Sequence, residues 1–170
     1  MRRIKNLISK GDIFQANLAT CCSTTLGEGY PSIAIFNRLR NYCPAPFSGL
    51  VIGNGKARNE SVMSVSPERF LKVFPSGEIE TRPIKGTRPR DQNPLTDADM
   101  AIELVSSTKD RAENIMVVDL LRNDLGRVCI PGSINVSQLV GLESYSQVHH
   151  LTSVVQGRLR SNKTWVDLLE

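Results

Sequence analysis

Aromatic residues, paired cysteines and long apolar runs are scarce in this sequence, and each shortage excludes a class of protein. Aromatic side chains make up 5% of the 170 residues, so the exposed rings that accompany a basic stripe in nucleic-acid-binding domains are largely missing. Cys21, Cys22, Cys43 and Cys129 have neither the C-x-x-C spacing of a zinc site nor the density of a secreted disulfide scaffold. We therefore expect reduced thiols in an intracellular protein that does not bind nucleic acid.

Membrane association is not expected either. No apolar stretch approaches the roughly 20 residues that cross a bilayer, and the opening residues MRRIKNLISKGD lack the apolar core of a signal peptide. These absences predict a cytoplasmic protein, or a plastid protein if a transit peptide precedes Met1 in the native chain. The net charge of +4 is modest and spread along the chain, which suits attraction of a small anion.

With 40% hydrophobic and 22% charged residues, the composition is that of an ordinary folded domain. We expect residues 1–170 to form one α+β domain, incomplete at its C-terminus. Helical spacing predicts helices within 3–9 and 30–44, a long helix from a capping Asp97 to about Gly126, and a helix opening within 161–170. Alternation predicts strands within 11–20, 47–53, 61–74, 78–84, 132–145 and 147–159. The buried side of the long helix should carry Met100, Ala101, Leu104, Val105, Thr108, Ala112, Ile115, Met116 and Leu120.

The stretch TRPIKGTRPR, residues 81–90, sets Lys85 between two prolines and beside a glycine, with three arginines and no acid. Proline fixes φ and glycine adopts conformations that other residues avoid, so the stretch favours a shaped loop over a regular element. Nearby positive charge disfavours protonation of an amine, and a free amine is a nucleophile. A solvated basic loop is the simpler alternative.

Glu68 and His150 are further candidates for chemistry. Glu68 follows a proline at the end of an alternating run, where a partly desolvated carboxylate could act as a general acid. The alternative is an ion pair with Arg69 or Arg82. His150 shares a strand face with valines, so a hydrogen-bonded core histidine is the alternative to a catalytic or substrate-binding one. Nothing is inferred for His149.

Asp110 and Glu113 lie three residues apart in the acid-rich stretch KDRAENIMVVDLLRNDLGR. Residues at this spacing share a helix face, and two carboxylates on one face can hold Mg²⁺ directly or through water. Surface ion pairs with Lys109, Arg111 or Arg122 are the alternative.

Five segments, GDIFQANL, SPERF, TRPIKGTRPR, KDRAENIMVVDLLRNDLGRV and VHHLTS, occur in the order and approximate spacing seen in chorismate-utilising enzymes. The sequence thus resembles the family of anthranilate synthase component I, aminodeoxychorismate synthase component I, isochorismate synthase and salicylate synthase. The resemblance implies an anthranilate synthase component I-like fold, with a mixed antiparallel sheet and packed helices. It covers nearly the whole chain, but only the first and larger part of the family's catalytic region.

Within the family, lysine in PIKGT is typical of aminodeoxychorismate synthase component I, whereas anthranilate synthases usually carry alanine there. The resemblance implies that Lys85 attacks C2 of chorismate and expels the C4 hydroxyl, with Glu68 as the general acid. Ammonia from a glutamine amidotransferase partner then adds at C4 and releases the lysine, which leads toward para-aminobenzoate and folate. Such a covalent intermediate divides one difficult substitution into two easier steps.

The remaining roles also follow from the resemblance. Glu113 matches a carboxylate that binds Mg²⁺, and Asp110 matches one that touches the water shell of the ion. Gly86 and Thr87 match substrate-contacting positions, and His150 matches a histidine beside the reacting ring. Gln15 stands where isochorismate and salicylate synthases have a water-activating lysine, so water would stay unactivated.

The family's GAPK segment, its second set of metal-binding glutamates and its carboxylate-gripping tyrosine and arginine would lie beyond Glu170. We therefore expect a partial catalytic domain with exposed apolar surface that binds substrate poorly and is inactive by itself. Two alternatives stay open: anthranilate synthase component I, and a truncated, non-catalytic binding or assembly module.

Overall fold

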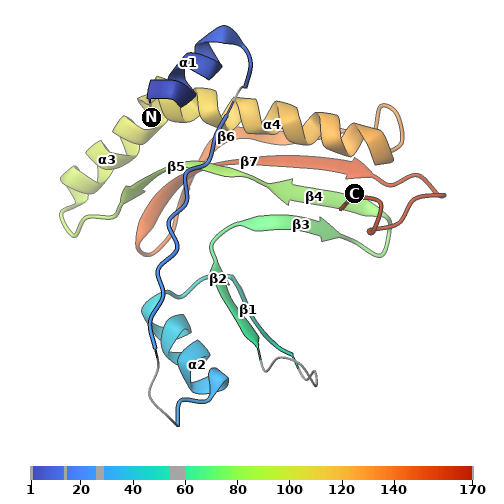
Figure 1. The fold of residues 1–170 in the computed structure, drawn as a ribbon. Coiled ribbons are helices and arrows are strands. Elements are labelled where there is room, and N and C mark those ends of the chain that lie inside the picture. The colour runs from blue at the N-terminus through green and yellow to red at the C-terminus, as the bar shows by residue number, and fades with distance from the viewer. Residues whose placement is uncertain (1, 14, 26–28, 54–59, 170) are drawn as a thin grey trace.

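The computed structural model describes residues 2–13, 15–25, 29–53 and 60–169. It has a five-stranded antiparallel sheet with two helices along one face, and a separate two-stranded sheet beside a third helix (Figure 1). The architecture is α+β, as the sequence predicts. The helices are α1 (Arg2–Lys10), α2 (Ser32–Tyr42), α3 (Pro94–Ser106) and α4 (Thr108–Val128), and the strands are β1 (Phe47–Ile52), β2 (Ser61–Ser66), β3 (Arg69–Val73), β4 (Glu78–Arg82), β5 (Ile84–Pro89), β6 (Asn135–Ser144) and β7 (Val148–Arg158).

Strand β7 organises the larger sheet. On one side it pairs with β6, and on the other it pairs first with β5 and then with β4. Strand β3 pairs with β4 but not with β5. The outer edge of β5 is therefore left without a strand partner among the described residues.

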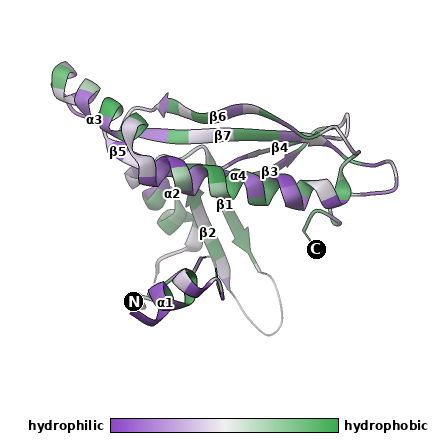
Figure 2. Cartoon of the chain, turned by 90° about the horizontal axis from the view of Figure 1, so that it is seen from above, coloured by the Kyte–Doolittle hydropathy of each residue, from purple (hydrophilic) through white to green (hydrophobic). Residues whose placement is uncertain are grey.

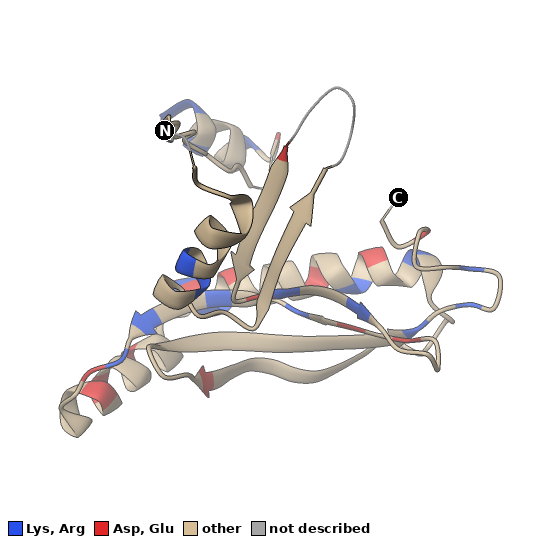
Figure 3. Ribbon diagram, turned by 90° about the horizontal axis from the view of Figure 1, so that it is seen from below, with Lys and Arg blue, Asp and Glu red and all other residues tan. Residues whose placement is uncertain are grey.

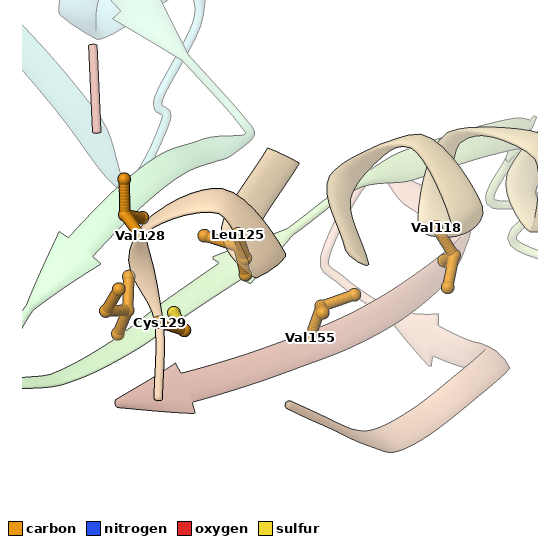
Figure 4. Packing of buried hydrophobic residues seen from close by; sticks show 6 residues of the cluster. Val118, Leu125, Val128, Cys129 and Val155 are labelled. Carbon is orange, nitrogen blue, oxygen red and sulfur yellow. The ribbon is translucent and has the colours of Figure 1, made fainter. Parts of the chain in front are cut away.

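The core lies between this sheet and α4. Val118 and Leu125 of α4 pack with Val155 of β7, as Figure 4 shows. A second buried cluster joins Leu104 of α3 to Leu151 of β7. Burying these side chains contributes roughly 1.5–3 kcal/mol each, which holds both helices on the sheet face opposite the two-stranded sheet.

The prediction of one long helix from a capping Asp97 is wrong, because the chain forms two helices, α3 and α4, in this region. Asn93 caps α3, with its side chain accepting from the Leu95 N–H and Pro94 in the first turn. Ser107 ends α3 and caps α4 through the Asp110 N–H. The break changes the helical phase, so the buried residues are Leu104, Asn114, Val118, Leu125 and Val128, and Val105, Thr108, Ala112, Ile115 and Leu120 are exposed.

Three further expectations are corrected. The described residues of 11–20 are irregular and not a strand, and Phe14 lies outside the described residues. The run 61–74 splits at Pro67 into β2 and β3, which belong to different sheets. Residues 161–169 form turns instead of a helix, with Thr164 and Asp167 hydrogen-bonded to each other.

The β1–β2 hairpin presents uncovered apolar surface, as expected. Its ribbon is largely hydrophobic in Figure 2 and carries no charge along its strands in Figure 3. Val51 is 67% exposed, and Ile52 and Val62 are exposed as well. None of the described helices is both long and apolar enough to cross a membrane.

Candidate active site

Residues 84–89 of the lysine-containing stretch form strand β5, so the predicted loop is wrong. The strand is irregular, however: Ile84 pairs with Thr152 and Thr87 pairs with His150, with a register shift between the two pairs. Between these pairs, two residues of β5, Lys85 and Gly86, thus oppose the single residue Leu151 of β7. Gly86 has a φ of 91°, a left-handed conformation that favours glycine.

Gly86 also allows β5 to lie directly against the start of α4. A Cβ atom on Gly86 would stand 2.8 Å from the Asp110 Cβ and 3.0 Å from the Leu104 Cδ1. A side chain at position 86 would therefore push the strand away from the helix. The lack of a side chain brings the backbone next to Lys85 into contact with one of the two predicted metal-binding acids.

Glu68 lies on the outer edge of β5. Its Oε1 accepts a 2.6 Å hydrogen bond from the Ile84 N–H, a donor that β3 leaves unpaired because this strand begins at Arg69. The Ser66 hydroxyl donates to the Glu68 carbonyl and fixes the turn between β2 and β3. The alternative ion pairs with Arg69 and Arg82 are not formed, because those arginines bind Glu80 and Glu143. The carboxylate thus stands beside the backbone of Ile84, the residue that precedes Lys85.

His150 is buried and hydrogen-bonded. Its Nδ1 lies 2.8 Å from the Thr87 Oγ1, and its ring centroid is 5.8 Å from that of Tyr145. Burial lowers the pKa of His150 below its usual value, although the Gly86 backbone and the charges of Glu143 and Glu68 oppose the shift. The imidazole is therefore neutral at pH 7 and able to accept a proton.

Lys85 is half-buried, and its amine has no hydrogen bond or ion pair within the described part of the chain. The sequence places three arginines near Lys85, and in the structure all three are paired with acids. Arg82 binds Glu143, Arg88 binds Glu103 and Asp110, and Arg90 binds Asp97. What distinguishes Lys85 is thus its free amine among paired cations.

Asp110 and Glu113 extend from the first two turns of α4. The Asp110 side chain is 15% exposed and lies 3.3 Å from the Arg88 guanidinium, whereas Glu113 is 46% exposed with Lys109 3.9 Å away. No group of three metal-ligating side chains occurs among the residues that the structure describes. Two carboxylates still fit Mg²⁺, which commonly takes one or two carboxylates together with waters and substrate oxygens.

Two hollows lie on the sheet face that His150 shares with Thr152. One has a volume of about 160 Å³ and is bordered by Pro67, Tyr145 and His150. The other, of about 210 Å³, is bordered by Ile84 and Thr152 among others. Asp110 lies against Gly86 on the helix side. Contacts with β5 thus come from His150 through Thr87, from Glu68 through the Ile84 N–H, and from Asp110 through Gly86.

Gln15 is not brought into this group. It is exposed in the irregular segment between α1 and α2 and has no hydrogen bond within the described residues. Arg88, which binds Asp110, was not predicted to be a site residue. His149, for which nothing was inferred, lies 3.0 Å from Asp97 and 2.7 Å from the Ser144 hydroxyl. The hydrogen bonds from Arg90, from the Asp91 N–H and from His149 hold the pKa of Asp97 well below its usual range.

Comparison with known proteins agrees with the resemblance. The family described as chorismate binding enzyme matches residues 1–170. The chain is 40% identical over 169 residues to aminodeoxychorismate synthase component 1 of Salmonella typhimurium, covering 99% of this chain and 36% of that protein. It is 42% identical over 150 residues to the chloroplastic aminodeoxychorismate synthase of Arabidopsis thaliana, covering 88% of this chain and 16% of that protein.

Among solved structures, anthranilate synthase component I from Streptococcus pneumoniae superposes with a TM-score of 0.74 at 29% identity. The match covers 99% of this chain and 35% of that one. The chain thus spans about a third of the length of the bacterial proteins that it resembles.

Proposed function

Because the chain belongs to the family of chorismate-binding enzymes, we propose that it is part of an aminodeoxychorismate synthase component I and takes part in the amination of chorismate at C4. Its substrate is chorismate, its second substrate is ammonia, and its product is 4-amino-4-deoxychorismate, a precursor of para-aminobenzoate and folate. Two observations carry the proposal: the Lys85 amine has no partner within the described residues, and Glu68 accepts a hydrogen bond from the N–H of the preceding residue, Ile84.

Lys85 is the nucleophile of this proposal. Its neutral amine forms a bond to C2 of chorismate while the ring double bonds shift and the C4–O bond breaks. Glu68 gives its proton to the departing hydroxyl, which leaves as water. Ammonia then forms a bond to C4, the double bonds shift back, and the C2–N bond to Lys85 breaks.

The Thr87 and His150 pair serves the same steps. A neutral imidazole can accept the proton that the attacking amine or ammonia loses. The hydroxyl of Thr87, 2.8 Å from Nδ1, and the Gly86 backbone fix the orientation of the ring. Gly86 supplies backbone groups that a substrate can approach closely.

Asp110 and Glu113 would hold Mg²⁺. The ion would neutralise a carboxylate of the dianionic substrate, and this allows an acidic helix to face an anion. Arg88 binds Asp110. It would therefore compete with Mg²⁺ for this carboxylate and would neutralise the carboxylate when no ion is bound.

Residues 1–170 would act as one part of a larger catalytic region, with a glutamine amidotransferase as the source of ammonia. The "component 1" in the name of the Salmonella relative supports a partner component. A plastid or the cytoplasm is the proposed location, and the chloroplastic relative supports the first of these.

A second candidate is anthranilate synthase component I, which the Streptococcus structure favours. The product separates the two, because anthranilate forms with release of pyruvate and aminodeoxychorismate forms without it. The test supplies the chain with chorismate, ammonia and Mg²⁺, and follows both products by chromatography. Anthranilate with pyruvate would reject the proposal.

A third candidate is a non-catalytic assembly module. Its distinguishing property is the absence of magnesium-dependent chorismate binding, which calorimetry on the chain measures directly. Binding that requires Mg²⁺ would exclude this candidate.

A further inference from the structure

Helix α4 carries one polar side chain that is completely buried, Asn114, which follows Glu113 in the sequence. Its exposed fraction is 0%, and the other buried residues of the helix are Val118, Leu125 and Val128. An amide at a core position costs stability unless both its polar groups are satisfied. Its presence therefore calls for a specific set of partners.

Both ends of the Asn114 amide have partners on β7. The Nδ2 donates to the Leu151 carbonyl at 3.0 Å, and the Oδ1 accepts from the Ser153 hydroxyl at 2.5 Å. The Ser153 oxygen in turn accepts from the Val140 N–H at 2.9 Å. Val140 has a φ of 52° within the irregular part of β6. One chain of hydrogen bonds thus joins α4, β7 and β6.

These bonds restrict α4 in a way that its apolar contacts do not. Aliphatic side chains tolerate small slides and rotations, because dispersion forces are weakly directional. Hydrogen bonds weaken steeply with misalignment. Because both ends of the Asn114 amide are hydrogen-bonded, α4 has one favourable rotation about its axis and one favourable position along β7.

The position of the amide relates this restriction to the site. Asp110 lies one helical turn before Asn114 and contacts Gly86. Leu151, which accepts from the amide, follows His150 directly. Asn114 therefore connects the helix that carries the predicted metal-binding acids to the residue that follows the predicted catalytic histidine.

We propose that Asn114 is a positioning residue. Through its hydrogen bonds to Ser153 and Leu151, it fixes where Asp110 and Glu113 lie relative to Gly86 and His150. The catalytic part of this inference rests on the proposed function. Asn114 itself cannot contact a substrate, because it is completely buried under α4.

The test compares Asn114→Leu and Ser153→Ala with Val118→Ala. Leucine keeps the branching of asparagine at Cγ without its hydrogen bonds, although it is larger. The control shortens a core side chain of the same helix and leaves the network intact. Backbone resonances and amide exchange are measured for all three variants. Ser153→Ala removes one hydroxyl only, so it reports on the network even if Asn114→Leu does not fold.

Ser153→Ala should accelerate exchange of the Val140 N–H about tenfold, as expected for the loss of about one hydrogen bond. Both network variants should shift the resonances of Gly86 and His150, whereas Val118→Ala, at comparable loss of stability, should leave them in place. Equal shifts at Gly86 and His150 in all variants would overturn the proposal.

A second measurement separates positioning from the proposed function. If the chain turns over chorismate, Asn114→Leu should raise the Mg²⁺ concentration needed for half-maximal rate about tenfold and change the KM for chorismate less. An unchanged Mg²⁺ requirement would contradict positioning of the acids. Formation of anthranilate and pyruvate in place of aminodeoxychorismate would reject the proposed function, while the resonance comparison would still decide the role of Asn114.

Discussion

The α-carbon of Gly86 lies against the side chain of Asp110, so close that a Cβ on the glycine would stand 2.8 Å from the Cβ of the acid. Through this contact, the strand that bears Lys85 lies against the helix that bears the two carboxylates. The two residues are 24 positions apart in the sequence, and neither segment alone has a feature that predicts the contact.

Gly86→Ala should lower the free energy of unfolding by about 2–4 kcal/mol, because it adds a left-handed backbone penalty to overpacking against Asp110. Gly132→Ala is the matched control, since Gly132 has a φ of 80° but nothing within 4 Å of a Cβ. It should cost about 1–2 kcal/mol. Equal costs in urea denaturation would show that the contact with Asp110 does not matter.

Glu68→Gln should keep the structure and slow the reaction. Glutamine can still accept from the Ile84 N–H, so stability should change by less than about 0.5 kcal/mol. It cannot supply a proton, so turnover of chorismate should fall about 10²–10⁴-fold. Glu68→Ala should lose a further 1–3 kcal/mol or so of stability, because a part-buried N–H is left unpaired. Full activity in Glu68→Gln would remove Glu68 from the role of acid.

The sequence was sufficient for the α+β class and for most strands, because alternation and turn residues mark those elements locally. It did not reveal the break at Ser107. This serine closes α3 and caps α4, and the apolar spacing continues across it. The phase error that follows explains why Ile115 and Leu120 were expected to be buried and Asn114 was not.

The candidate site was predicted less completely. Motif resemblance identified Glu68, Lys85 and Asp110, but the partners of the arginines depend on which strands are neighbours. Arg82 meets Glu143, 61 residues away in the sequence, and such pairs have no local signature. Strand β5 was missed because its glycine and prolines, typical of loops, are accommodated at an irregularity and at the strand ends.

Stability should fall as the pH decreases from about 7.5 to about 5.5, and His150 should account for part of the loss. Burial lowers its pKa in the folded state, so the unfolded chain takes up a proton first, near the ordinary value of 6.5. The contribution is therefore complete above that value and decreases as the pH falls toward the folded pKa. His150→Gln should flatten the pH profile of the unfolding free energy in this range. An unchanged profile would contradict a buried, neutral His150.

Glu113→Gln should raise the Mg²⁺ concentration required for chorismate binding, by about tenfold or more, because the ion loses a charged oxygen ligand. Asp119→Asn is the control, since Asp119 lies on the same helix, is 80% exposed and pairs with Arg122. It should leave the requirement unchanged. Equal effects of the two substitutions in calorimetric titrations would indicate only a general loss of negative charge.

Mass spectrometry of the chain with chorismate and Mg²⁺, without ammonia, tests most directly whether Lys85 is the nucleophile. The expected result is a mass increase equal to chorismate less one water, located on the peptide that contains Lys85, absent from Lys85→Ala and removed when ammonia is added. Amination of chorismate by Lys85→Ala at the unaltered rate, with no adduct on the unaltered chain, would contradict it.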